Sequence, residues 1–403
     1  MIKVQEAIDI IVSKAGSLKE EIIPLEKSLG RITSKNIYAN INNPPENVSS
    51  MDGYAVRFTN LKNLKKLPIK IVGESPAGKP YLKNLNNYEC VQIFTGAIVP
   101  KSTNLILIQE RVKIKNNFIV STDQNYYKGQ YIRKKGSNFK VKSLIIKKNS
   151  PVTSRIIGLA ISSNNSKIKV FKKLNIAILS NGDELRKLNN NLNGGIISSN
   201  TPMLKALITS FGANIYDIGI AKDTVNSLKN KLKNINRYDI LITTGGASVG
   251  KHDLVKDALK ELGMKLIFWK VAMRPGKPLI FGKLKNTLIL GFPGNPVSAF
   301  VSSLVFLKPL ISMYSHIKDD LKIKEGILTK HLTSNDERQE YLRAKIRFNN
   351  NIYKVEPLSG QDSSMSAYLC NSDGLIIRKP YDKALKIGSK VLIIIFSDIH
   401  PNI

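Results

Sequence analysis

The chain contains only two cysteines, Cys90 and Cys370, among its 403 residues. Two cysteines so far apart exclude the dense disulfide framework that stabilises many small secreted domains. The first residues alternate apolar and charged side chains and lack the apolar core of a signal peptide. These absences lead us to expect a cytoplasmic protein with reduced thiols.

Long apolar runs are also missing from the sequence. No run approaches the roughly 20 residues that cross a bilayer, so we expect no membrane-spanning segment and no membrane partner.

Acidic residues are scarce: 30 Asp and Glu stand against 62 Lys and Arg, for a formal net charge of +32. A charge of that size favours polyanions such as nucleic acid. The lysines are spread over the whole chain, however, and the densest run, 128–148, has no aromatic platform beyond Tyr131 and Phe139. This spread favours a compositional bias, and we expect no nucleic-acid partner.

The residues that are present predict a globular protein of several domains. Hydrophobic residues make up 42% of the chain, and its length predicts roughly two to four domains. An amphipathic helix over 4–15 comes first, and Asp52-Gly53 predicts a hairpin turn. Short β-like runs then fill 57–143. Strands and helices alternate over 175–313, which predicts a largely parallel, doubly wound sheet with helices on both faces. A smaller β-rich region ends the chain.

The stretch from Tyr238 to Asp253 combines three local signals. An apolar run predicts a buried strand, the following glycines predict a tight loop, and Asp253 opens an amphipathic helix that ends at Gly263. This order presents backbone N–H groups to an anion. Gly245 to Lys251 also has the spacing of a phosphate-binding P-loop. Because His252 replaces the hydroxyl residue that binds magnesium, an NTPase is the weaker alternative.

Three acidic residues follow strands of the predicted sheet, namely Glu184, Asp223 and Asp253. Singly, Asp223 and Asp253 are ordinary helix N-caps, and Glu184 is a solvated loop residue. Together on one rim, they predict an oxygen-ligand site for Mg²⁺ or another divalent metal.

Two further loops on this rim favour anions. Arg274 and Lys277 lie on a turn stiffened by Pro275 and Pro278, although such a turn could equally be a solvated surface loop. The run 291–298 ends where Pro296 opens a long apolar helix, whose N-terminus favours negative charge. Carboxylates for a metal beside cationic loops point to a phosphorylated or oxyanionic substrate.

The motifs together resemble those of one family over nearly the whole chain. They are Ser50-Met51-Asp52-Gly53-Tyr54-Ala55, Phe94-Thr95-Gly96-Ala97 with Gln109-Glu110, Gly182-Asp183-Glu184-Leu185, Thr244-Gly245-Gly246-Ala247-Ser248-Val249-Gly250, Arg274-Pro275-Gly276-Lys277-Pro278 and Pro293-Gly294-Asn295-Pro296-Val297-Ser298. The chain is similar to the molybdopterin molybdenumtransferases, known as MoeA in bacteria and as the E domain of gephyrin in animals.

The resemblance implies a multidomain fold of α/β and β type. A discontinuous N-terminal domain (1–45 and 144–170) would surround an inserted β domain (46–143). A pterin- or nucleotide-binding α/β domain (171–315) and a C-terminal β-barrel (316–403) would follow. It also implies a homodimeric enzyme that inserts molybdate into adenylylated molybdopterin with release of AMP, and possible contacts with other cofactor-biosynthesis proteins and molybdoenzymes.

The resemblance implies roles for individual residues as well. Asp52, Glu184, Asp223 and Asp253 match catalytic acids, the last three as metal ligands, and Asp52 would face the second subunit's site. The predicted substrate contacts are Thr95, Gly245, Gly246, Ser248, Arg274, Lys277, Pro293, Asn295, Pro296, Ser298, Arg338 and Ser363.

Four motifs depart from the family pattern. Asn138 and Ser198 replace usual aspartates, Asp362 replaces a usual glycine, and Glu46-Asn47-Val48 replaces a usual Phe-Asp-Asn. Asn138 cannot act as an anionic ligand. The lost acids keep open a second hypothesis, a non-catalytic pterin-binding or scaffold member of the same family.

Overall fold

The computed structural model describes residues 1–64, 66–122, 125–189, 194–246, 254–315 and 321–399. The chain forms two compact units: Met1–Glu20 with Phe171–Ile403, and Glu21–Val170. We call them the α/β–barrel unit and the N-terminal β unit. The finer division into four domains stays a prediction.

A six-stranded sheet forms the centre of the α/β–barrel unit, in the order β16-β13-β17-β21-β20-β18. The first four strands are parallel, and β20 and β18 are antiparallel to their neighbours. Apolar runs made these strands predictable, since a strand covered on both faces is apolar throughout. Their bounds are Asn214–Ala221 (β16), Asn175–Asn181 (β13), Ile240–Thr244 (β17), Thr287–Phe292 (β21), Pro278–Leu284 (β20) and Lys265–Lys270 (β18).

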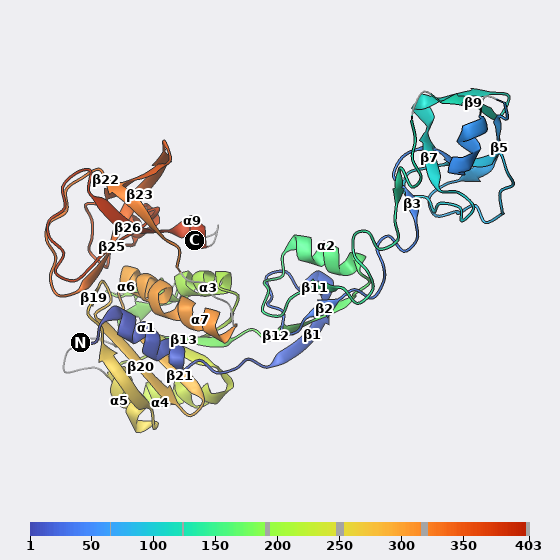
Figure 1. The fold of residues 1–403 in the computed structure, drawn as a ribbon. Helices are drawn as coiled ribbons and strands as arrows, with labels where there is room; N and C mark the ends of the chain where they lie inside the picture. The colour runs from blue at the N-terminus through green and yellow to red at the C-terminus, as the bar shows by residue number, and fades with distance from the viewer. Residues whose placement is uncertain (65, 123–124, 190–193, 247–253, 316–320, 400–403) are drawn as a thin grey trace. The chain divides into compact units, whose positions relative to one another are not determined.

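Helices cover both faces of this sheet, as the alternating pattern predicted (Figure 1). Ile178 and Ile242 point to one face, while Leu179 and Leu241 point to the other, because strand side chains alternate. The first face packs against α1 (Val4–Ser13), α3 (Asn200–Ser210), α6 (Pro296–Ser302) and α7 (Lys308–Tyr314), and the second against α4 (Val225–Leu232) and α5 (Leu254–Glu261).

The long apolar helix corrects one expectation from the sequence. Pro296–Tyr314, which includes a π-helical turn at Ser303–Leu307, has 19 residues and is long and apolar enough to cross a membrane by those criteria alone. The statement that no run approaches that length was therefore wrong. Of the 18 most apolar consecutive residues in it, 89% are buried inside the protein, as expected for the core helix of a folded domain.

The C-terminal strands close into a five-stranded barrel. The ladder β23-β24-β22-β26-β25 is closed by a direct pairing of β23 with β25, which confirms the predicted β-barrel. The short strand β19 (Met273–Arg274) pairs with β23 and ties an α/β loop to the barrel. The barrel elements are β22 (Ile323–Leu328), β23 (Gln339–Asn349), β24 (Ile352–Pro357), α8 (Ser366–Cys370), β25 (Gly374–Arg378), β26 (Lys390–Ile395) and α9 (Phe396–Ile399).

The N-terminal β unit contains a second six-stranded sheet, in the order β7-β4-β6-β5-β9-β8. Its bounds are Gly53–Val56 (β4), Ile69–Ser75 (β5), Glu89–Ile93 (β6), Leu105–Ile108 (β7), Val112–Lys115 (β8) and Phe118–Thr122 (β9).

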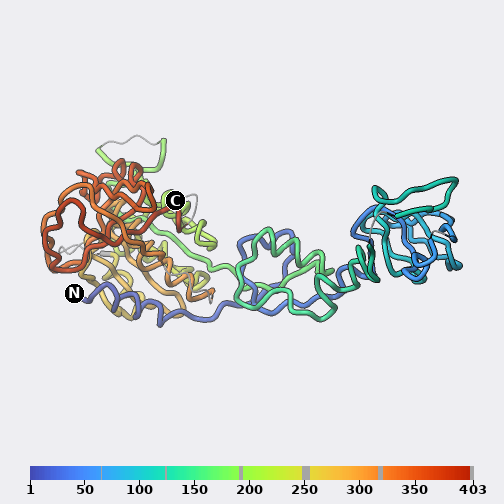
Figure 2. The backbone as a smooth tube through the Cα atoms, turned by 45° about the horizontal axis from the view of Figure 1, so that its top comes forward, coloured from blue at the N-terminus to red at the C-terminus, as the bar shows by residue number. Residues whose placement is uncertain are grey.

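The segments that precede and follow this sheet in the sequence run side by side, and Figure 2 shows them in blue and green. Short ladders join them: β1 (Glu20–Pro24) with β12 (Lys167–Phe171), β2 (Ile37–Tyr38) with β11 (Leu144–Ile146), and β3 (Val48–Ser49) with β10 (Ile132–Arg133), beside α2 (Ser154–Ser162).

The predicted hairpin turn at Asp52-Gly53 is absent. The strand before it, β3, pairs with β10, whereas Gly53 begins β4, which pairs with β6 and β7. The two strands flanking the turn thus choose different partners, and only long-range pairing reveals this. Asp52 therefore lies in a bend at the start of a strand.

Candidate functional site

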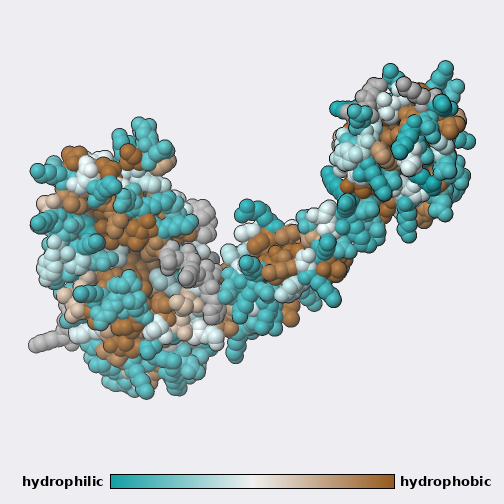
Figure 3. All heavy atoms as spheres, in the orientation of Figure 1, coloured by the Kyte–Doolittle hydropathy of each residue, from teal (hydrophilic) through white to brown (hydrophobic). Residues whose placement is uncertain are grey.

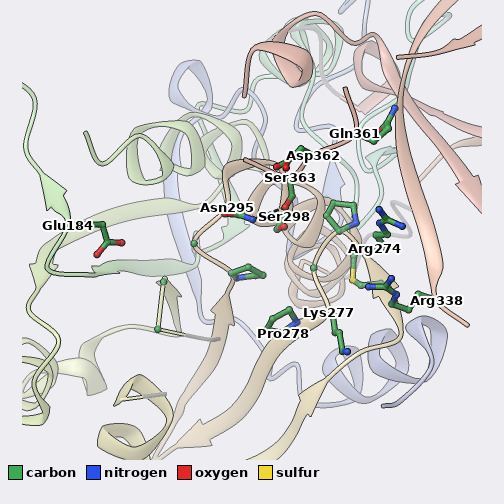
Figure 4. Close-up of a pocket in the computed structure, with 17 residues that line it drawn as sticks. Glu184, Arg274, Lys277, Pro278, Asn295, Ser298, Arg338, Gln361, Asp362 and Ser363 are labelled. Carbon is green, nitrogen blue, oxygen red and sulfur yellow. Dashed lines mark hydrogen bonds between the residues drawn. The ribbon is translucent and has the colours of Figure 1, made fainter. Parts of the chain in front are cut away.

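A cavity of about 620 Å³ lies between the carboxyl edge of the α/β sheet and the barrel (Figure 4). Its volume is typical of a small-molecule site. Ten predicted site residues line it, although they come from six separate segments: Glu184, Gly245, Gly246, Arg274, Lys277, Pro293, Asn295, Ser298, Arg338 and Ser363. Pro296 lies next to it as the first residue of α6. The roles assigned to these residues stay predictions.

The glycine loop after β17 is shaped by close backbone approach. Gly245 has φ +85°, and a Cβ there would lie 2.2 Å from the carbonyl oxygen of Asn181 on the neighbouring strand. Only glycine meets both conditions. The rest of this loop, 247–253, lies outside the described residues, so the predictions for Ser248 and Asp253, and the P-loop alternative, are not addressed by the structure.

The Arg274 loop is fixed to the barrel before any ligand arrives. Its first residues form β19, and Gln339 of the barrel donates its N–H to Ala272 O at 2.9 Å. Gly276 has φ +109°, and a Cβ there would lie 3.0 Å from Ser302 Oγ. Glycine therefore lets the turn pack against the buried helix α6.

The three cations of the cavity differ in how far their charge is already neutralised. Arg274 lies 3.5 Å from Glu340, a buried carboxylate, and Arg338 binds Asp336 through Nε at 3.0 Å. The hydrogen bonds from Arg338 lower the pKa of Asp336 to about 2. Lys277 has no ion pair with any residue that the structure describes. Lys277 is thus the cation with the most charge available to a ligand.

The helix start is less open to an anion than the sequence predicted. The N–H of Val297, in the first turn of α6, donates to Ser363 O of the barrel at 3.1 Å, so it is not free. Asn295 also donates to Ser363 Oγ at 2.7 Å. Ser298, 3% exposed, still lines the cavity. The anion preference here rests on the cations more than on free N–H groups.

The barrel contributes a loop of which sequence reasoning assigned only Ser363 to the site. Gln361 and Asp362 line the cavity, and Gln361 bonds the N–H and carbonyl of Arg343. Arg343, 1% exposed, donates to the carbonyl oxygens of Asp362 and Met365. Burial lowers the pKa of Arg343. Apart from Ser363, this loop was noted only where Asp362 departs from the family pattern, because nothing local shows that Gln361 and Asp362 face the α/β sheet.

Glu184 and Asp223 both follow strands of the sheet, as predicted. Figure 4 shows Glu184 on the opposite side of the cavity from the cations Arg274, Lys277 and Arg338. Asp223 is not the helix N-cap, because Thr224 accepts from Ser227 N at 3.2 Å and fills that role. The Asp223 carboxylate instead accepts from Asn181 Nδ2 at 2.6 Å and from Asp183 N at 3.2 Å.

The fit of a metal to these residues can be tested in part. Among the described residues, no group of three or more His, Cys, Asp or Glu side chains is placed to hold a metal ion. Asn181 Oδ1, beside Asp223, is buried and has no hydrogen-bond partner. An orphan acceptor next to a carboxylate suits a hydrated cation. Asp223 and Asn181 therefore offer oxygen donors of the kind that a divalent metal binds, but the third predicted ligand, Asp253, lies outside the described residues, and the metal site stays a prediction.

Asp52 and Thr95 belong to the N-terminal β unit and form a pair there. Asp52 Oδ1 accepts from Thr95 N at 2.7 Å and from Thr95 Oγ1 at 2.8 Å. These two bonds, the backbone one first, lower the pKa of Asp52. Thr95 thus holds an ionised carboxylate in place, and its role as a substrate contact stays a prediction.

The fold and the cavity together define a class of protein: a multidomain α/β-plus-barrel protein with a polar cavity suited to oxyanions. Known proteins agree. Residues 2–163 match the "MoeA N-terminal region (domain I and II)", residues 177–313 a "probable molybdopterin binding domain", and residues 325–396 the "MoeA C-terminal region (domain IV)".

Individual relatives extend this agreement over the chain. The chain is 30% identical to the molybdopterin molybdenumtransferase of Nostoc sp., over 95% of this chain and 91% of that protein. It is 32% identical to the Haemophilus influenzae protein of the same name, over 72% of each. The crystal structure of a MoeA molybdopterin biosynthesis protein from Pyrococcus horikosii matches with a TM-score of 0.85 at 27% identity, covering 98% of this chain and 99% of that one. The chain belongs to the molybdopterin molybdenumtransferase family of enzymes.

Proposed function

We propose that this protein inserts molybdate into adenylylated molybdopterin and releases AMP in a reaction that depends on a divalent metal. The observation that carries the proposal is the cavity of the α/β–barrel unit. Its motif loops meet there, with Lys277 as an unpaired cation on one side and Glu184 as a carboxylate on the other. Molybdate is a dianion and requires positive charge and N–H donors.

Each side of the cavity has a separate task in this proposal. Lys277, with Arg274 and Arg338, binds and orients the oxyanion, while Ser298 and the fixed Arg274 loop set its position. Glu184 and Asp223, joined by Asp253, would hold Mg²⁺ or a related cation. When bound, that ion would draw negative charge from the phosphoanhydride oxygens. The barrel loop around Ser363 lines the cavity beside Asn295 and Ser298.

A homodimer with Asp52 shared between subunits is part of the proposal. The N-terminal β unit exposes apolar side chains, which Figure 3 shows in brown. Tyr38 and Leu144 face each other across β2 and β11 and are 49% and 44% exposed, and Val141 and Ile161 are each 47% exposed. Such surfaces commonly lie in interfaces. We also propose a cytoplasmic location, with other cofactor-biosynthesis proteins and molybdoenzymes as partners.

The family departures bear on the alternative, a non-catalytic member. Ser198, in place of a usual aspartate, lies 3.3 Å from Ser180 Oγ in a cluster of hydroxyls. Asn138 lies exposed in the N-terminal β unit and donates its N–H to Asn43 O. Asp362 adds a carboxylate to the cavity. The retained acids Asp52, Glu184 and Asp223 favour the enzyme.

The decisive experiment is cofactor assembly from purified adenylylated molybdopterin, molybdate and Mg²⁺, with AMP release as the readout. Wild-type protein should release AMP, and Glu184→Gln should not, while both melt at the same temperature. Glu21→Gln, a matched change in the N-terminal β unit, should retain activity. Binding of the pterin without AMP release by the wild type would favour the scaffold alternative. Equal rates for wild type and Glu184→Gln at limiting Mg²⁺ would refute the metal assignment.

The shared site has its own test. Asp52→Asn and Glu184→Gln proteins, each inactive alone, should regain part of the activity when subunits are exchanged. Verified mixed dimers without activity would exclude a site shared in this way.

A further inference from the structure

A second cavity, of about 580 Å³, lies wholly within the N-terminal β unit. It shares no lining residue with the first cavity. Its walls come from the segments around Asn47, from 98–104 and from 128–135. The proposed reaction uses none of these side chains, so the cavity requires a separate explanation.

The charges around this cavity are one-sided. Four lysines line it, namely Lys101, Lys128, Lys134 and Lys135, against a single acid, Glu46. Glu46 pairs with Lys135 at 2.9 Å. Among the residues that the structure describes, Lys101, Lys128 and Lys134 have no ion pair. Three unneutralised ammonium groups around one hollow attract a compact anion, for which phosphate is the usual match to lysine.

The cavity also has an apolar side. Val99 and Pro100 are buried, Val99 belongs to one apolar cluster with Ile132, and Ile98, 36% exposed, also lines the cavity. A site for a bare inorganic anion does not need such a wall. A ligand with a flat ring would bury apolar surface against it while its charged group reaches the lysines.

The backbone around the cavity is preformed. Asn47 accepts from Val99 N through its carbonyl and from Lys135 N through Oδ1, both at 2.9 Å, so it joins two walls. Gly129 N donates to Asn104 O at 2.7 Å, which joins the 128–135 segment directly to the 98–104 segment. A rigid frame lowers the entropy cost of binding.

We propose that this cavity binds a small phosphorylated compound that carries an apolar ring. The lysines bind the phosphate, and the wall of Ile98, Val99, Pro100 and Ile132 holds the ring. Because the chain has a net charge of +32, general attraction of anions is the competing explanation. The test must therefore distinguish binding in this cavity from nonspecific attraction to positive charge.

Pyridoxal 5′-phosphate is a suitable probe, because its aldehyde condenses with a lysine amine with loss of water. Borohydride then reduces the imine to a stable amine, and peptide mass mapping of the full chain locates it. Labelling at Lys101, Lys128 or Lys134 should exceed that at Lys113 and Lys115, exposed lysines of β8 outside the cavity, by about tenfold, as one charge-assisted hydrogen bond provides. Pyridoxal without the phosphate should lose this preference.

Variants complete the test. Lys101→Gln with Lys134→Gln should remove the preferential labelling of Lys128, whereas Lys113→Gln with Lys115→Gln, an equal loss of charge on the same unit, should preserve it. Ile98→Asn, at an exposed position, should weaken labelling without any change of charge. Equal labelling inside and outside the cavity, equal labelling by pyridoxal, or equal effects of the two lysine pairs would overturn the proposal.

Discussion

The two cavities show that a lysine-rich chain does not make every cation equally available. In the α/β–barrel unit, Arg274 and Arg338 already face Glu340 and Asp336, and Lys277 alone among the three is unpaired within the described chain. Of the four lysines that line the second cavity, in the N-terminal β unit, three have no ion pair among the described residues. If both proposals hold, the first cavity selects its anion by position and the second by accumulated charge. Pairing, which composition does not reveal, makes the difference.

Gly245→Ala should have the largest effect, because it distorts the glycine loop that lines the first cavity and does not touch the second. The added Cβ would meet a backbone carbonyl at 2.2 Å, and neither strand can yield. We expect a loss of about 3 kcal/mol or more in unfolding free energy, measured by urea denaturation.

Gly263→Ala is the matched control, since Gly263 also has positive φ (+94°) but open space around it. It should cost only about 1 kcal/mol. Equal losses in the two variants would show that the clash at Gly245 is relieved by movement of the loop.

Lys277→Ala should come next, because it removes the unpaired cation of the first cavity. A lost charge-assisted hydrogen bond is worth about 1.5–3 kcal/mol, or roughly ten- to a hundredfold in the apparent molybdate constant at saturating pterin adenylate. The constant for the pterin adenylate should change far less, because that large ligand has other contacts. Lys283→Ala, an exposed lysine of β20, is the control. If excess molybdate does not rescue Lys277→Ala, this loop does not hold the oxyanion.

Asp362→Asn should raise the net positive charge of the first cavity and so bring it closer to the charge of the second. Hydrogen bonds from Ser364 lower the pKa of Asp362, so it is ionised at neutral pH and opposes an oxyanion. Molybdate should bind about two- to fivefold more tightly to the variant, the range for exposed charge pairs. Titration of molybdate in the assembly assay checks this, and weaker binding would mean that Asp362 positions the loop instead.

Asp336→Asn should have the smallest effect, and it depends on pH. The folded-state pKa of about 2 lies below the ordinary 3.8, so the ionised carboxyl stabilises the fold above pH 3.8, and this contribution is lost as pH falls through about 2. Because the pair is partly exposed, the gap between wild type and variant at pH 6 should stay below about 1 kcal/mol. Denaturation from pH 6 to 2 should show the gap closing; a constant gap would mean that charge is not its source.

Local pattern was sufficient for much of the fold. The apolar runs at 176–179 and 240–242 and the alternation of strands with helices over 175–313 predicted the central sheet. A strand that is buried on both faces of a parallel sheet needs apolar side chains at consecutive positions, and this run is visible in the sequence. The motif residues Glu184, Lys277 and Ser298 were likewise named before any geometry, because each follows a strand or opens a helix at the edge where parallel sheets bind ligands.

Two of the failures involved partners distant in sequence. Asp52-Gly53 has the composition of a hairpin turn, but β3 and β4 pair with different strands. Asp223 precedes a helix, yet Thr224 caps it and Asp223 faces Asn181. The third failure was local: the length of the apolar run Pro296–Tyr314 was underestimated.

The sequence by itself determined the family, the α/β core and the residue types available for oxyanion chemistry, because those depend on periodicity and on ordered motifs. Tertiary structure alone decided which charges are free. Glu340 reaches Arg274 from the barrel, Ser363 takes the N–H of Val297, and Asn47 joins the walls of the second cavity. Hydrogen bonds and ion pairs act over a few ångströms in space, whatever the separation along the chain, so no local pattern encodes them.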